Sequence, residues 1–450
     1  MKQTYSSWGK IKQFFIVLLP IFITQISLIS TGFFDTVMAG HVSEQDLAGV
    51  AVGANLFMPV FGSILGVISG LTPVISQLYG ARKKEEIPFV IIQGLYLSVI
   101  IGIVLILLAA VLIQPVFTVL NLEPRVDYIA KMYLLAMAFG LCPIFAAGVF
   151  RNFMDAFGYT RFTMLITICA VPCNIFMNYL FMFGKFGFPE LGGIGAGVGT
   201  AITFYVVLGL NILVVRKLSP FKEYNIFSKF CKPSVSQWKR QLCIGLPIGS
   251  AMFCEQSIFG AVGIFMTVYG TGVIAAHQAA LNFTTMVYMI PLSISMTLTI
   301  LVGFEIGAKR LDDAKKYSYM GVGLSMLVAS TLAMVLIQFK GAIATLYTND
   351  EVVNQLVQSF IVYAIFLQVS DGVSAPIQGT LRGYKDVKIT FFLAILSYWV
   401  IGLPSGYILA NYFSYGPYGY WMGLIIGIAV GAVFLGFRLR FVQKSLLGKN

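Results

Sequence analysis

Three carboxylic acids, Asp35, Glu255 and Asp371, stand inside long apolar stretches of this 450-residue chain. The rest of its 18 acidic residues lie in loops or at expected helix ends. A carboxylate at membrane depth costs at least ~2.5–3.5 kcal/mol, so a functional role is the first hypothesis. No lysine or arginine is expected deep enough to pair with these acids. They predict sites for a mobile cation: a proton, a metal ion or a cationic substrate. The alternative is a protonated acid hydrogen-bonded to a neighbouring helix.

Polar and aromatic side chains accompany the acids at helical spacing. In the second half, those expected to contact a substrate are Gln278, Asn282, Tyr288, Phe259, Gln368, Ser374 and Gln378. In the first half, Asn174 and Asn178 stand four residues apart, and their amide oxygens are expected to complete a site with Asp35. The alternatives are ordinary hydrogen bonds between membrane helices for the amides, and lipid contact for the aromatics.

The composition indicates that lipid surrounds most of the chain. Hydrophobic residues make up 58% and charged residues 11%, whereas soluble domains have roughly 45–50% and about 25%. The mean hydropathy is +0.86. The net charge of +12 is expected on one side of a membrane, which argues against nucleic-acid binding. Six cysteines without a C-x-x-C pair and two histidines offer little for a structural zinc site.

Apolar windows long enough to cross a bilayer occur twelve times, and none alternates as barrel strands do. The expected spans are 14–38, 50–79, 91–113, 127–150, 162–183, 194–215, 241–268, 277–302, 319–339, 354–378, 390–410 and 420–437. The sequence therefore predicts an all-α membrane protein.

The distribution of lysine and arginine predicts the orientation. With the N-terminus inside, all but four of the 30 basic residues (Arg125, Lys131, Lys185 and Lys340) fall in cytoplasmic segments. The densest basic block lies in 216–240: Arg216, Lys217, Lys222, Lys229, Lys232, Lys239 and Arg240. We therefore expect both termini on the cytoplasmic side of the plasma (inner) membrane. The expected domains are 1–217, a basic linker at 218–238, and 239–450.

The two halves repeat. When the sequence is aligned with itself at one offset, Leu19-Pro20-Ile21 matches Leu246-Pro247-Ile248. The same offset matches Gly80-Ala81-Arg82 with Gly307-Ala308-Lys309. A shift shorter by one residue lays Gly193 and Gly197 on Gly419 and Gly423. Each half has an even number of spans, so the halves are expected to be parallel. Two pseudo-symmetric six-helix lobes with a V-shaped central cleft would suit alternating access, and a monomer would suffice. Chance alignment of common residues is the alternative.

The sequence lacks the phosphate-binding motif of ATP-using proteins and the zinc-binding motif of metalloproteases. It contains no G-x-x-x-x-G-K-[ST] and no H-E-x-x-H. We expect no enzyme and no cofactor apart from a coupling ion.

Short motifs in a specific order resemble the multidrug and toxic compound extrusion (MATE) family, in its bacterial NorM-type branch. They are Leu19-Pro20 with Leu246-Pro247, residues 34–40, Gly80-Ala81-Arg82, Cys254-Glu255-Gln256, residues 279–282 and Leu381-Arg382-Gly383. The resemblance implies a cation-coupled antiporter that exports bulky cationic or zwitterionic drugs. It also implies a cation site at Glu255 and Asp371, and another at Asp35, Asn174 and Asn178. Another branch carries a second acid where this chain has Asn178, so a proton mechanism with two acids in the first half is not expected here.

The residues alone leave two choices open. Na⁺ is the favoured ion, held as a metal by Glu255 and Asp371 with neutral oxygens, whereas H⁺ needs only one buried acid. A lipid or polysaccharide-precursor flippase is the alternative function, although an anionic headgroup would call for arginines inside the cleft.

The predicted topology can be tested by cysteine labelling. Single cysteines at Ser43 and Asn411 should react with an impermeant thiol reagent on intact cells, because both positions lie in expected outside loops. One at Ser234, in the basic linker and with native Cys231 removed, should stay unlabelled. The reverse pattern would invert the predicted orientation.

Overall fold

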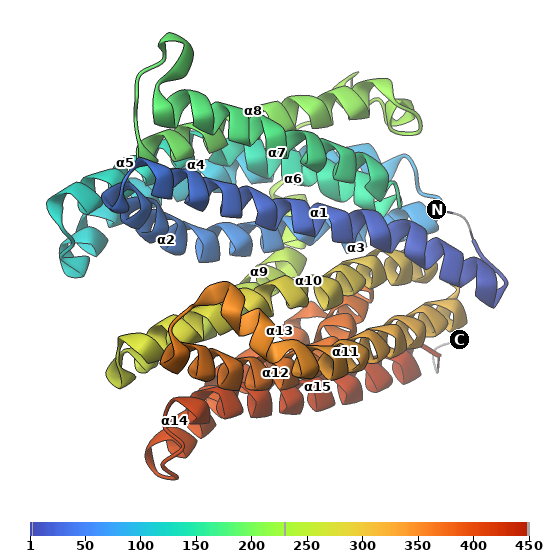
Figure 1. Cartoon of the computed structure of the whole chain (residues 1–450). Helices are drawn as coiled ribbons and strands as arrows, with labels where there is room; N and C mark the ends of the chain where they lie inside the picture. Colours follow the sequence, from blue (N-terminus) through green and yellow to red (C-terminus); the bar gives the residue numbers. More distant parts are fainter. Residues whose placement is uncertain (2, 229–230, 448–450) are drawn as a thin grey trace. The chain divides into compact units, whose positions relative to one another are not determined.

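The computed structural model describes residues 1, 3–228 and 231–447, and this part of the chain is helical, without a β-strand. Lys229 of the basic block lies outside the described residues. The α-helices, shown in Figure 1, are α1 (Ser7–Val42), α2 (Glu44–Ser69), α3 (Leu71–Gly80), α4 (Glu86–Leu120), α5 (Pro124–Phe139), α6 (Leu141–Ala156), α7 (Thr160–Phe183), α8 (Gly193–Lys217), α9 (Val235–Met266), α10 (Thr271–Gly307), α11 (Leu311–Tyr347), α12 (Glu351–Gly383), α13 (Val387–Ile395), α14 (Leu403–Asn411) and α15 (Pro417–Leu447). The short segments are η1 (Lys185–Gly187), η2 (Phe221–Tyr224), η3 (Ile226–Ser228), η4 (Thr267–Tyr269) and the π-helical η5 (Leu396–Gly402).

The twelve predicted spans are confirmed in number if a bent helix pair counts as one. Within the described residues, 11 helices are long and apolar enough to cross a membrane. The twelfth span is formed by α5 and α6, which meet at an angle of 49°. Helices α2 and α3 together form one candidate span, Glu44–Gly80. Helices α13 and α14, with η5 between them, form another, Val387–Asn411.

The break between α5 and α6 has a local cause. Pro143 has no N–H to donate to the carbonyl of Phe139, four residues earlier. The hydroxyl of Tyr205 donates to that free carbonyl at 2.9 Å. At the bend, a Cβ on Gly140 would lie 2.7 Å from a ring carbon of Phe204. A proline and a glycine thus let α8 pack against the bend.

Apolar side chains on the outer helices account for the lipid-like composition. The most apolar windows of α4 and α11 are each only 11% buried. On α4, Leu107 is 62% exposed and Val111 is 70% exposed. Such surfaces are stable only in contact with lipid, because exposing them to water would forfeit their transfer free energy.

The chain forms two compact units, and each contains the start of a helix that continues in the other. Leu19–Gly249 form unit 1, while residues 3–18 and those from Ser250 onward form unit 2. In unit 2, buried Lys10 pairs with Asp313 at 3.0 Å. In unit 1, the Gln241 amide donates to the Val90 carbonyl at 2.9 Å. The domain limits 1–217, 218–238 and 239–450 stay a prediction.

The close packing of α14 and η5 on α15 within unit 2 depends on a row of glycines. They repeat every four residues on one face of α15: Gly419, Gly423, Gly427 and Gly431. A Cβ on Gly423 would lie 2.3 Å from the Cα of Gly406. Small residues let membrane helices approach until their backbones touch, which replaces the hydrophobic effect as the source of attraction.

Replacing Gly423 by leucine should therefore destabilise the protein, whereas the same change at Gly436 should not. Gly436 lies on the same helix, and no atom lies within 4 Å of its Cβ position. We expect Gly423→Leu to lower the midpoint of thermal unfolding in detergent by at least about 5 °C. Equal midpoints for the two variants would refute the close-packing argument.

Candidate functional site

Two carboxylates and one guanidinium form a charged cluster within unit 2. Glu255 comes from α9 and is partly buried, while Asp371 comes from α12 and is 5% exposed. The two carboxylates act on each other electrostatically. Arg382, near the end of α12, is buried, and its charge acts on Glu255. When all three groups are ionised, the cluster carries one excess negative charge.

Arg382 corrects the expectation that no base lies deep enough to pair with the acids. The apolar window was expected to end at residue 378, which left Arg382 in a loop. Instead α12 continues to Gly383, and Arg382 is 8% exposed. The Leu381-Arg382-Gly383 motif could have revealed this base. If the helix continues past the apolar window, Arg382 lies within two helical turns of the window's last residues.

Two tyrosine hydroxyls complete the surroundings of the cluster. Tyr288 on α10 donates a hydrogen bond to the Glu255 carboxylate. It was predicted to offer an aromatic face, and the structure gives it a polar contact. Tyr398, which sequence reasoning missed, is buried and lies within electrostatic reach of Glu255 and Asp371.

Tyr398 stands in the π-helical segment η5. Pro404, two residues after η5, cannot donate to the carbonyl four residues before it, and this favours a departure from regular α-helix. The indole N–H of neighbouring Trp399 donates to the carbonyl of Cys254 at 3.3 Å. This bond joins η5 to α9 next to Glu255. Irregular backbone of this kind often marks functional sites.

The other predicted residues of the second half lie in four settings. Gln378 donates to Ser374 at 3.3 Å within α12. Gln278 and Asn282 are exposed on α10, and Phe259 packs against the hydrophobic core. Gln368 donates to the carbonyl of Thr284 at 2.9 Å and lines a separate pocket.

Unit 1 brings its three predicted residues together. The Asn178 amide donates to Asp35 at 2.5 Å and contacts the Asn174 oxygen at 3.3 Å. Thr200 of α8, which sequence reasoning missed, accepts from Asn174 at 3.0 Å and also hydrogen-bonds to Asp35. Both asparagines are fully buried. This carboxylate is held by neutral partners, in contrast to the acids of unit 2.

A glycine on α8 makes room for this network. A Cβ on Gly199 would lie 2.3 Å from the Oδ1 atom of Asn178. That oxygen is buried and has no hydrogen-bond partner. The amide oxygen is therefore available to a cation, while its nitrogen is engaged by Asp35.

Oxygen atoms dominate both sites, which favours a hard cation or a proton. In the part of the chain that the structure describes, no three histidine, cysteine or acidic residues come together as a metal cluster. Two carboxylates with tyrosine hydroxyls nearby offer oxygen ligands, whereas structural zinc sites are built mainly from cysteine and histidine.

Comparison with known proteins places this geometry in context. The MatE family model matches residues 20–180 and 247–408. The two matches begin at Pro20 and Pro247, the pair that the internal repeat aligns, so the repeat is confirmed.

Curated relatives are similar over nearly the whole chain. The probable multidrug resistance protein NorM of Halalkalibacterium halodurans is 48% identical over 99% of this chain and 97% of that protein. The NorM protein of Bacillus subtilis is 47% identical over 100% of both chains.

Solved structures share the fold at low identity. The eukaryotic MATE transporter AtDTX14 superposes with a TM-score of 0.86 at 18% identity, covering 98% of this chain and 99% of that one. An outward-facing multidrug resistance MATE family transporter gives 0.87 at 18% identity, covering 99% and 100%.

Tyr288→Phe should weaken cation binding, because it removes the hydrogen bond that holds the Glu255 carboxylate. We expect about a tenfold loss in Na⁺ affinity, the effect of one hydrogen bond to a charged group, measured by calorimetry on the purified protein. Tyr363→Phe is the matched control, since Tyr363 stacks on Tyr418 at 5.5 Å instead. Unchanged affinity in Tyr288→Phe would show that the hydroxyl does not organise the site.

Proposed function

This chain belongs to the MatE family, and we propose that it is a secondary active multidrug efflux antiporter of the plasma membrane, with both termini cytoplasmic. It exports bulky cationic or zwitterionic compounds in exchange for Na⁺ or H⁺ by alternating access. A single chain surrounded by lipid suffices, and neither nucleic acid nor an organic cofactor takes part.

The excess negative charge of the unit 2 cluster carries this proposal. Glu255 interacts with Asp371 and with one buried base, Arg382. Leaving a carboxylate unneutralised in a low-dielectric site is costly. The cluster is therefore expected to take up a cation whenever one can enter, and a coupling ion and a cationic drug compete for the same charge.

Competition for shared charge couples the two fluxes. Open to the cytoplasm, the site takes up a cationic amphiphile; open to the outside, it takes up an external ion that displaces the drug. Each ligand lowers the affinity for the other by the same factor. One charge moving down 100 mV yields ~2.3 kcal/mol, enough for roughly a fiftyfold substrate gradient.

We favour Na⁺ as the coupling ion. A carboxylate pair with the nearby tyrosine hydroxyls supplies several oxygen ligands in unit 2, whereas the unit 1 site holds one acid, Asp35, among neutral partners. A proton mechanism built on Asp35 is the alternative, because a single buried acid is enough for it.

A lipid or polysaccharide-precursor flippase is the competing function. Buried Arg382 would offer one positive charge to the anionic headgroup of a flippase substrate. Glu255 acts on this charge, however, and Asp371 acts on Glu255, so the cluster with all three groups ionised repels anions. The net charge of the site therefore favours export of cations.

Glu255→Gln and Asp371→Asn should each abolish ion-driven efflux of a fluorescent cation from cells. Expression should stay near normal, because removing a membrane carboxylate lowers the cost of insertion. Asp312→Asn is the control for the loss of a surface acid, since Asp312 is exposed at the start of α11. Efflux at the wild-type rate in both site variants would contradict the proposal.

A further inference from the structure

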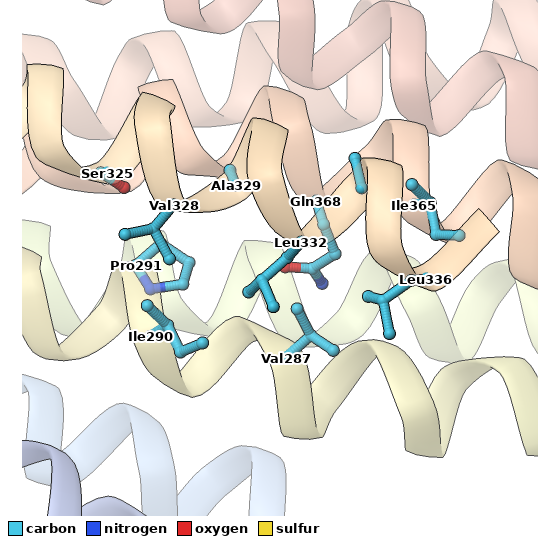
Figure 2. Close-up of a pocket in the computed structure, with 11 residues that line it drawn as sticks. Val287, Ile290, Pro291, Ser325, Val328, Ala329, Leu332, Leu336, Ile365 and Gln368 are labelled. Carbon is cyan, nitrogen blue, oxygen red and sulfur yellow. The ribbon is translucent and has the colours of Figure 1, made fainter. Parts of the chain in front are cut away.

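A second pocket in unit 2 lies between α10, α11 and α12, apart from the charged cluster. These helices contact one another along their lengths, and Figure 2 shows the side chains that meet between them. The lining consists of Val287, Ile290, Pro291, Ser325, Val328, Ala329, Leu332, Ala333, Leu336, Ile365 and Gln368. Apart from Ser325 and Gln368, it is entirely apolar. Counted with the open region outside its mouth, the space amounts to about 330 Å³, and its enclosed part is little larger than one water molecule.

Gln368 presents an unused hydrogen-bond acceptor to this pocket. Its side chain is 5% exposed, and its amide nitrogen donates to the carbonyl of Thr284 at 2.9 Å. Its Oε1 atom is buried and has no partner. In Figure 2 the amide group points in among Leu332 and Val287. A buried acceptor without a donor is destabilising, so a donor that enters the pocket gains a full hydrogen bond.

Unit 1 contains the same combination in a pocket of its own. Val67, Ile68, Leu71, Gly94, Leu97, Ser98, Ile101 and Gln241 line it. The Nε2 atom of Gln241 donates to the carbonyl of Val90, and its Oε1 atom has no partner. The repeat that aligns Gly80 with Gly307 also aligns Ser98 and Ile101 with Ser325 and Val328. A mostly apolar pocket whose lining includes a glutamine with an unpartnered amide oxygen therefore occurs in both units.

We propose that the α10–α11–α12 pocket binds a neutral aliphatic alcohol from the membrane, with its hydroxyl donating to Gln368. The enclosed part has room for the hydroxyl beside the lone acceptor, and the apolar residues around the open mouth suit the alkyl chain. A cationic headgroup would lose its hydration without gaining a counter-charge, because no acidic side chain lines the pocket. The ligand class therefore differs from the cationic drugs proposed above, and the pocket does not depend on that function.

The pocket and the charged cluster occupy different faces of α10. Val287 lines the pocket, whereas the next residue, Tyr288, contacts Glu255. Consecutive residues point about 100° apart around a helix. An alcohol in the pocket thus binds beside the cation site without entering it.

Photolabelling of the purified full chain tests this site. The probe is a primary alkyl alcohol that carries a diazirine group, and its methyl ether is the matched probe without a donor. Mass spectrometry should locate saturable labelling on the segments 287–291 and 328–336. The ether should label about fivefold less than the alcohol, the difference made by one hydrogen bond.

Variants separate the pocket from general lipid contact. Val328→Trp should abolish saturable labelling by filling the space, and Leu332→Trp provides a second variant should the first not fold. Leu327→Trp should label like the wild type, because Leu327 is 65% exposed on the same helix. Gln368→Met should make the alcohol and the ether label equally. Equal labelling by both probes in the wild type, or saturable labelling that survives both tryptophans, would overturn the proposal.

Discussion

Neutralisation of buried charge is the constraint on which the rest of unit 2 depends. Two carboxylates and one guanidinium share a site built by α9, α12 and the neighbouring tyrosines. In such surroundings, Coulomb interactions are several-fold stronger than in water. The positive charge of Arg382 offsets the charge of one acid and so reduces the repulsion between the two carboxylates. Under the proposed function, the second acid is left to a mobile ion, and the charge balance of the cluster then accounts for its need for a cation.

Close helix packing brings these groups within reach of one another. A Cβ on Gly379 would lie 2.1 Å from the carbonyl oxygen of Ser295, so α12 touches the backbone of α10 directly. That contact sets the separation at which Tyr288 of α10 and Asp371 of α12 stand beside Glu255. Unit 1 uses the same device, with Gly199 giving Asn178 its place beside Asp35. Glycines thus set the geometry of both sites, although they supply no ligand atoms.

Apolar windows in the sequence were sufficient to predict the membrane spans. They also showed that Asp35, Glu255 and Asp371 lie within spans, because an acid in an apolar window is visible without coordinates. The sequence also predicted that Asn174 and Asn178 join Asp35, since helical spacing fixes which side chains share a face. It failed for Arg382, because hydropathy cannot tell a helix end from the loop that follows. Thr200 and Tyr398 were missed since contacts between helices far apart in the chain leave no local pattern. The substrate role predicted for Gln368 stays a prediction, and nothing in the sequence indicated that this residue also lines the second pocket.

Transport into vesicles under separately imposed gradients tests the central claim that an external cation at Glu255 and Asp371 drives export. Purified protein in vesicles would be given a Na⁺ gradient at constant pH, then a pH gradient at constant Na⁺, with a fluorescent cation as substrate. We predict that the Na⁺ gradient alone drives transport and that Glu255→Gln abolishes it. Transport driven only by the pH gradient, retained in Glu255→Gln and lost in Asp35→Asn, would contradict the account.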